Sequence, residues 1–196
     1  IDSIGDFEFL YEEEETYVEL IDKDIANLDK TGFRRNHIRD IKKAILIEDK
    51  LEFRRSNSEA DLKDYYELLK KNLQRHNVTP THSITELKWL IENLKNHIWI
   101  ELLTYENKIV SGLVCFKMNT NVLHYFYGST DYEFKNKGIL KYAYWQSMIN
   151  AKKNNFQYVN FGVDSKFGEV HNQSLRMFKE GFGGKHTHRK TVKFSC

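Results

Sequence analysis

The sequence predicts an α/β protein with one mixed central sheet and helices on both faces of that sheet. The first indication is the order of segments after residue 50, which reads strand, helix, helix, three strands, helix, strand, helix, strand. The second is the strand–helix–strand unit over residues 122–161, because a crossover of this kind makes its two strands parallel. The third is the composition, since 40% hydrophobic and 14% aromatic residues are enough to fill a core.

Residues 1–50 differ from the rest of the chain. Their apolar residues recur at helical spacing: Val18, Leu20, Ile21, Ile25 and Leu28, then Ile38, Ile41 and Ile45. We therefore expect helices over 16–29 and 33–45, separated by Gly32 as a stop signal. Residues 1–50 are accordingly predicted to be an N-terminal helical extension, or the remnant of a preceding domain, and residues 51–196 the main domain. The chain lacks an initiator Met, which suggests a fragment of a longer protein.

A short strand at residues 51–55 is followed by two helices. Ser58 begins an N-cap with an acidic residue three positions later, and apolar residues at spacings of three and four predict a helix over 59–75. Ser83 opens a capping box, SITE, and a second helix with one apolar face is expected over 84–94.

The remaining elements are joined by short connections. Strands are expected over 97–104, 108–117 and 122–128, and their short links require an antiparallel meander. The rest of the chain is predicted as a helix over 138–154, a strand over 156–161, a helix over about 170–180, a turn over 181–184 and a strand over 186–194. Ligands of open sheets bind beyond the carboxyl ends of parallel strands, so the loops Gly128–Gly138 and Gly162–Gly168 form the expected ligand edge.

Composition and motifs exclude several classes of protein. No stretch of about 18 apolar residues occurs, and the start IDSIGDFEF does not resemble a signal peptide, so we expect a cytoplasmic protein without a membrane span. Cys115 is interpreted as a core residue and Cys196 as a terminal one, so no disulfide framework is expected. Neither CxxC nor HExxH occurs, and His186 and His188 lack a third ligand, so no metal site is expected.

Charge is segregated along the chain although the net charge is only +2. Residues 6–29 are strongly acidic, whereas residues 34–55 and the C-terminal residues from 179 onward are basic. Two interpretations remain open: the basic zones bind a polyanion, or the acidic segment folds against a basic surface.

A loop with a glycine at the start of a helix is the first candidate binding site. It consists of Lys135, Asn136, Lys137, Gly138, Ile139 and Leu140. A glycine lets a ligand approach the backbone closely, and the amide groups at a helix start can hold a phosphate. The alternative interpretation is an ordinary loop with a flexible glycine.

The element order and this loop together resemble the GNAT acyltransferase superfamily. In that family the phosphate loop reads Arg or Gln, two residues, Gly, one residue, and Gly or Ala. Lys135 stands at the first position, Gly138 at the first glycine, and Leu140 replaces the second glycine. The resemblance implies a GNAT-like fold in which this loop holds the pyrophosphate of coenzyme A, with acetyl-CoA or another acyl-CoA as co-substrate.

The chain is also similar to the Fem-like branch, which contains peptidoglycan-bridge aminoacyltransferases and acyltransferases associated with cell-surface polysaccharides. The similar stretches are residues 34–44, 65–80, 134–162 and 175–184. Members of this branch carry paired GNAT-type domains. The resemblance implies transfer of an acyl group to an amine, on a sugar or a cell-wall precursor, and it admits aminoacyl-tRNA as an alternative donor.

Acyl transfer to an amine needs an unprotonated nucleophile, a cradle for the developing oxyanion and an acid for the leaving group. Backbone amides at the end of the strand 122–128 are candidates for the cradle. Tyr127 is the candidate acid, and strand alternation places Tyr125 on the same face. Asp164 is a candidate base or amine anchor, and Lys179 in MFKEGFGG resembles a lysine of the Fem-like signature that steadies the donor's phosphate or carbonyl.

Three further residues are weaker candidates. Glu101 in the meander is another potential base, while Arg75 and His76 resemble an Arg–His pair of the Fem-like signature or serve as helix C-terminal cations. Three functions thus remain open: an acyl-CoA-dependent N-acyltransferase, an aminoacyl-tRNA-dependent aminoacyltransferase, and a non-catalytic binding module of the same fold.

Overall fold

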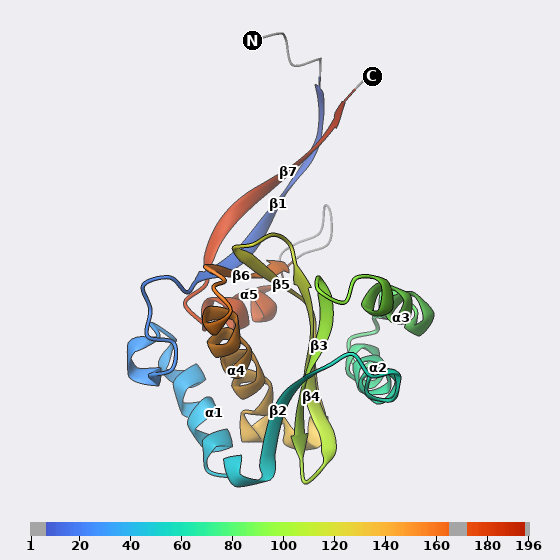
Figure 1. Ribbon diagram of the computed structural model, residues 1–196. Helices are drawn as coiled ribbons and strands as arrows, with labels where there is room; N and C mark the ends of the chain where they lie inside the picture. The colour runs from blue at the N-terminus through green and yellow to red at the C-terminus, as the bar shows by residue number, and fades with distance from the viewer. Residues whose placement is uncertain (1–6, 165–171, 195–196) are drawn as a thin grey trace.

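The computed structural model describes residues 7–164 and 172–194, which form a seven-stranded sheet with helices on both faces (Figure 1). The strands are β1 (Phe7–Glu19), β2 (Leu51–Ser56), β3 (Ile98–Tyr105), β4 (Lys108–Lys117), β5 (Val122–Thr130), β6 (Tyr158–Val163) and β7 (Lys185–Phe194). The helices are α1 (Arg35–Ile45), α2 (Glu59–Gln74), α3 (Ile84–Asn93), α4 (Ile139–Lys153) and α5 (Gln173–Glu180), with 3-10 turns η1 (Leu28–Lys30), η2 (Glu48–Lys50) and η3 (Tyr132–Lys137). The predicted α/β class is confirmed. None of the helices in this described part is long and apolar enough to cross a membrane.

The strand order is β2-β3-β4-β5-β6-β1-β7, and the sheet is mixed as predicted. β5 and β6 pair in parallel, because α4 carries the chain from the end of one to the start of the other. All other neighbouring strands pair antiparallel, including the predicted meander β3-β4-β5.

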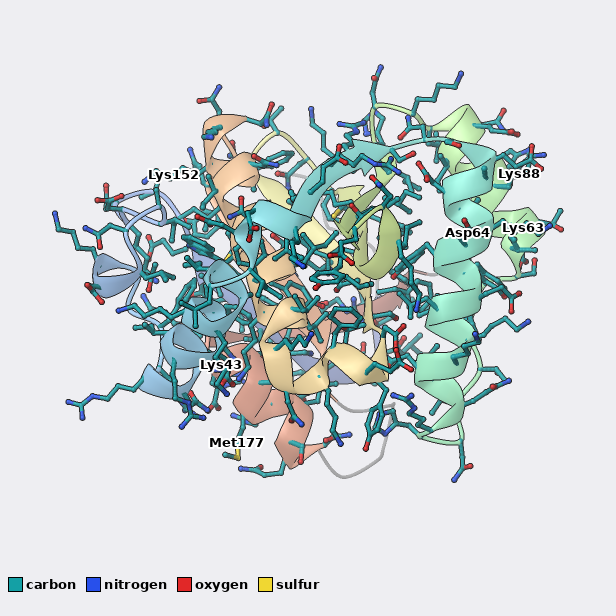
Figure 2. All side chains as sticks on the ribbon, turned by 90° about the horizontal axis from the view of Figure 1, so that it is seen from below. Lys43, Lys63, Asp64, Lys88, Lys152 and Met177 are labelled. Carbon is teal, nitrogen blue, oxygen red and sulfur yellow. The ribbon has the colours of Figure 1, made fainter. Side chains whose placement is uncertain are left out.

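Two hydrophobic cores lie on opposite faces of the sheet. α1, α4 and α5 cover one face, and α2 and α3 cover the other. Figure 2 shows this division from below, with Lys43 on α1 on one side and Asp64 on α2 on the other. We call the core under α1, α4 and α5 the α4 core, and the core under α2 and α3 the α2 core. Successive residues of β3 belong to different cores, since Trp99 lies in the α4 core and Ile100 in the α2 core.

The helix predicted over residues 16–29 is wrong. Residues up to Glu19 belong to β1, which lies between β6 and β7, and the connection from there to α1 is irregular apart from η1. Val18 and Leu20 are fully buried at a spacing of two, whereas Ile21, the residue that favoured a helical period, is 43% exposed. Pairing with β6 and β7 therefore decides the local structure. The origin of residues 1–50 as the remnant of a preceding domain stays a prediction.

The acidic segment of β1 folds against a basic strand. Glu13 lies opposite Arg189 of β7, and the Arg189 guanidinium forms ion pairs with both Glu13 and Glu15. For this segment, charge segregation along the sequence reflects pairing inside the molecule, which is the second of the two interpretations.

The predicted helices α2, α3 and α4 are confirmed to within two residues at either end. Ser58 accepts a hydrogen bond from the amide of Asp61 at the start of α2, and Ser83 and Glu86 form the predicted capping box of α3. α4 begins at Gly138, which has a φ of 74°. The predicted helix near 170–180 is described from Gln173.

Candidate functional site

β5 and β6 separate toward their carboxyl ends. Their last paired residues are His124 and Asn160, although β5 continues to Thr130 and β6 to Val163. A cavity of about 240 Å³ occupies the opening. Its walls include Tyr125, Tyr127 and Gly128 of β5, Tyr144 of α4, Phe161 of β6, and Phe178 and Lys179 of α5. This is the predicted ligand edge, at the carboxyl ends of the parallel strands, although residues 165–168 of the second predicted loop lie outside the described residues.

A β-bulge in β5 changes the direction of the tyrosines. Val114 pairs with Tyr127 and the next residue of β4, Cys115, pairs with Tyr125, so Phe126 is an extra residue in the ladder. Tyr125 therefore enters the α4 core and Tyr127 packs against the α2 core. The expectation that simple alternation places both on one face is wrong for this reason.

Lys179 brings a buried ammonium group to the wall of the cavity. The residue is 3% exposed, and its Nζ donates hydrogen bonds to the carbonyl oxygens of Gly162 (2.8 Å) and Val163 (2.7 Å) at the end of β6. Burial lowers the pKa of Lys179 to about 8, although the nearby carboxylates of Asp164 and Glu15 act in the opposite direction. The group is thus a strong hydrogen-bond donor at neutral pH.

Asp164 lies directly after β6 and is also buried, at 3% exposure. Its backbone carbonyl accepts a hydrogen bond from the amide of Asn172 (2.9 Å), the residue directly before α5. Its carboxylate is close enough to Lys179 to oppose the lowering of the lysine pKa that burial causes. The structure therefore brings two of the three candidate catalytic residues together.

Tyr127 lines the same cavity and holds a loop with its hydroxyl group. The hydroxyl oxygen accepts hydrogen bonds from the amides of Thr81 (2.8 Å) and His82 (3.2 Å). The hydroxyl also lies 3.3 Å from Nδ1 of His82, and because the two amides use its lone pairs, its O–H group can donate to this nitrogen.

The candidate phosphate loop divides into an exposed and a covered part. Lys135, Asn136 and Lys137 are exposed in η3, and the Lys135 ammonium lies 3.8 Å from the ring centre of Tyr132. Ile139 is buried and Leu140 half-buried. Gly138 is buried as well, and a Cβ atom at this position would lie 1.8 Å from the backbone carbonyl oxygen of Asp40.

Helix α1 covers the start of α4. The Asp40 carboxylate pairs with Lys141 of α4 (2.7 Å), and Lys141 and Lys43 lower its pKa to about 2 although burial acts to raise it. Gly138 thus accommodates α1 through its left-handed conformation and its lack of a side chain. The Asp40 carbonyl oxygen therefore lies directly beside Gly138, and it would repel a phosphate that approached the same atom.

The first half of α1 contacts the end of α5. His37 Nε2 hydrogen-bonds to the Phe178 carbonyl oxygen (2.9 Å), and its ring lies 4.6 Å from that of Phe182. A Cβ atom at Gly181 would lie 2.0 Å from the His37 ring. Figure 1 shows α1 alongside α4, on the same side of the sheet as α5. α1 therefore bridges α5 and the start of α4.

The weaker candidates lie away from this cavity. Glu101 is buried between β3 and α4, the Arg75 guanidinium lies 3.8 Å from the ring centre of Tyr132, and His76 is exposed after α2. His186 contacts Glu180 and His188 contacts Glu12. Within the described residues no group of three or more His, Cys, Asp or Glu side chains is arranged to hold a metal ion.

Two features of the site were not found by sequence reasoning. Tyr144 places its hydroxyl oxygen 2.1 Å from where a Cβ atom at Gly128 would lie, so Gly128 is needed for this contact. His37 and Asp40 meet α5 and α4 across more than 90 residues of sequence. Gly128, Gly138 and Gly181 were the available signals, because each marks a close approach, but a sequence does not say by what.

Comparison with known proteins identifies the family. Residues 32–169 match the acetyltransferase (GNAT) domain, and the chain belongs to this family. No curated protein sequence matches the chain.

Solved structures share the fold at low identity. FemX superposes with a TM-score of 0.72 at 13% identity, covering 92% of this chain and 61% of its own. The C-terminal domain of a putative lysylphosphatidylglycerol synthetase from Agrobacterium fabrum gives 0.66 at 13% identity, covering 95% and 61%. An aminoglycoside acetyltransferase from an uncultured soil metagenomic sample, in complex with sisomicin, gives 0.51 at 19% identity, covering 69% and 89%. The chain thus has the fold of a Fem-like GNAT domain and spans about three fifths of FemX.

Proposed function

We propose that the chain carries an N-acyltransferase site in the cavity between β5 and β6, with Lys179 as the main catalytic residue. The observation that carries this proposal is the buried Lys179 ammonium at the carboxyl end of β6, on the wall of the cavity. A fixed donor with little access to water stabilises the negative charge that develops on an acyl carbonyl oxygen.

In the proposed reaction the acceptor amine nitrogen bonds to the acyl carbon and the donor's leaving group departs. Asp164 takes the proton that the amine loses, or holds the amine before reaction, and Tyr127 gives a proton to the leaving group. The burial of Asp164 beside Lys179 and the place of Tyr127 in the wall of the same cavity support these roles. The resemblance to the Fem-like branch favours an amine on a sugar or a cell-wall precursor as acceptor.

Acyl-CoA, in its simplest form acetyl-CoA, is the first candidate donor because the chain belongs to the GNAT family. Residues 135–140 would hold the pyrophosphate, with Lys135 and Lys137 supplying charge. Since Asp40 covers Gly138, binding of coenzyme A in this manner requires α1 to shift. Such a donor would place the reaction in the cytoplasm.

The position of Asp40 favours a second candidate donor, aminoacyl-tRNA, whose phosphates need not contact the start of α4. Its acyl ester would enter the cavity while the RNA backbone lies on the exposed basic residues. Binding of this kind weakens steeply with salt.

One experiment compares the two donors. The melting temperature is measured with acetyl-CoA, longer acyl-CoAs and free coenzyme A, and tRNA binding is measured at low and high salt. A ligand at 100 times its Kd adds about 2.7 kcal/mol to the free energy of unfolding, which gives a clear rise in melting temperature. If no acyl-CoA and no tRNA binds, both donor assignments fail and the non-catalytic binding module remains.

A further inference from the structure

A second cavity lies beside the C-terminal half of α4, at the end of this helix remote from Gly138. Its volume is about 500 Å³. Its walls include Arg55 of β2, Trp99 and Glu101 of β3, Lys117 of β4, and Asn150 and Asn154 at the end of α4. None of these residues lines the cavity between β5 and β6, so the two spaces have separate walls.

Glu101 is the residue that requires an explanation. It is 5% exposed and lines this cavity, and its Oε1 accepts a hydrogen bond from the Trp99 indole (3.3 Å), while its Oε2 accepts a longer contact from the Cys115 thiol (3.6 Å). In the described part of the chain no cationic group lies within 4.0 Å of its carboxylate. Burial raises the pKa of Glu101, although the side chains of Ser147, Trp99 and Cys115 and the charge of Arg55 act to lower it. A buried carboxyl group without an ion pair is costly, and residues of this kind gather at binding sites.

The mouth of the cavity carries positive charge. Arg55 of β2 lies opposite Glu101 of β3 in the strand ladder. Its guanidinium lies 4.1 Å from the ring centre of Trp99. Its Nη2 donates to the carbonyl oxygen of Lys95 (2.8 Å), which fixes the side chain in this position. Lys117 adds a second cation to the lining. The cavity therefore has a carboxyl group inside and cations toward solvent.

We propose that this cavity binds a small zwitterion of the α-amino acid class, with its amine on Glu101 and its carboxylate toward Arg55 and Lys117. The order of charges in the cavity matches the order of charges in such a molecule. A carboxylate on the protein accepts from an ammonium, and a guanidinium binds a carboxylate through paired hydrogen bonds. The volume lies in the range of small-molecule sites. The side-chain amide groups of Asn150 and Asn154 provide neutral hydrogen-bonding partners for the rest of the ligand.

The experiment is an NMR titration of the wild-type chain with L-alanine, glycine, ethylamine and propionate, observing the indole N–H signals. The Trp99 signal is assigned as the indole N–H signal that remains in both Trp89→Phe and Trp145→Phe. We expect L-alanine and glycine to shift the Trp99 signal with a saturating curve, and ethylamine and propionate to do so at least tenfold more weakly. If the zwitterions shift the Trp99 signal no more than the two single-charge probes do at a concentration of about 10 mM, about ten times a Kd of about 1 mM, the proposal fails.

Variants supply a second readout. Glu101→Gln is expected to weaken L-alanine binding at least tenfold, and Arg55→Ala severalfold, while Glu92→Gln on the surface of α3 leaves it unchanged. Unchanged binding in folded Glu101→Gln overturns the proposal, and if this variant does not fold, the wild-type titration decides. Lys179→Met should bind L-alanine normally, so a failed transferase assay and a failed binding assay are distinguishable.

Discussion

The Lys179 side chain is 3% exposed, and its ammonium group donates to two main-chain carbonyl oxygens, so it has little freedom to move. It remains positioned before any substrate arrives, which is the condition for efficient stabilisation of a developing charge. A flexible surface lysine near the same cavity would lose this advantage, because ordering it would oppose catalysis.

Lys179→Met should therefore lower kcat/KM for acyl transfer by about 100- to 1000-fold, the usual effect of losing one donor to an oxyanion. The measurement is a steady-state assay with whichever donor binds. Lys88→Met, an exposed lysine on α3, is the matched control and should retain full activity. Equal activity of the two variants would remove Lys179 from the mechanism.

Gly138→Ala tests what the glycine at the start of α4 does. The positive φ and the Asp40 carbonyl oxygen 1.8 Å from the new Cβ atom should lower the free energy of unfolding by at least about 2 kcal/mol. Gly32→Ala is the control, since Gly32 has a φ of 76° but open space around it, and should cost about 1 kcal/mol. Urea unfolding measures both, and equal losses would show that the contact with α1 contributes nothing.

Single residues also mark where sequence reasoning stops. Tyr127 and Asp164 are predicted from their places at strand ends and Lys179 from the resemblance to the Fem-like signature, and all three lie around the opening between β5 and β6. The direction of Tyr125 was not predictable, because a bulge depends on how two strands pair and leaves no residue signature in β5.

Among the elements, α1 was predicted to within two residues, but its position was not. Its apolar face showed that it packs against something, and periodicity contains no information about the partner. β1 was misread because Val18, Leu20, Ile25 and Leu28 are all buried, although only the first two lie at the end of a strand or just beyond it. Short apolar patterns fit either period, and long-range pairing decides between them.

The docking of α1 should depend on pH through His37. Burial, helped by Lys141, lowers the pKa of His37 to about 4 from its usual 6.5. The folded chain therefore binds fewer protons than the unfolded chain between pH 6.5 and 4, and the free energy of unfolding falls as pH falls through this window, by up to about 3 kcal/mol.

Chemical unfolding at pH 7 and pH 4.5 checks this dependence, with His37→Gln compared to wild type. The variant lacks the titrating group and should lose less stability on acidification. His76→Gln, at an exposed position, should follow the wild-type curve. A wild-type curve parallel to that of His37→Gln would contradict the assignment.

At the scale of the whole molecule, one sheet contributes residues to both hydrophobic cores. The overall class and the parallel pair were predictable because the order of segments restricts the possible topologies to a few. The places of β1 and β7 at one side of the sheet were not, since their pairing joins the two ends of the chain.

A cavity made in either core should lower the midpoint of one shared unfolding transition. Leu87→Ala removes a buried side chain from the α2 core and Met148→Ala one from the α4 core, and each should cost about 2–5 kcal/mol. Far-ultraviolet circular dichroism and tryptophan fluorescence should report coincident midpoints for both variants. Separate midpoints would show that the two faces unfold independently.

The cover that α1 places over Gly138 has a quantitative consequence for any nucleotide that approaches this helix start. Its observed affinity would be the intrinsic one multiplied by the small fraction of molecules in which α1 has moved aside, so every 1.4 kcal/mol of docking free energy weakens apparent binding about tenfold. Substitutions that loosen α1 without unfolding the chain would then tighten such binding. The affinity of a short acyl compound that enters beside Lys179 would not change.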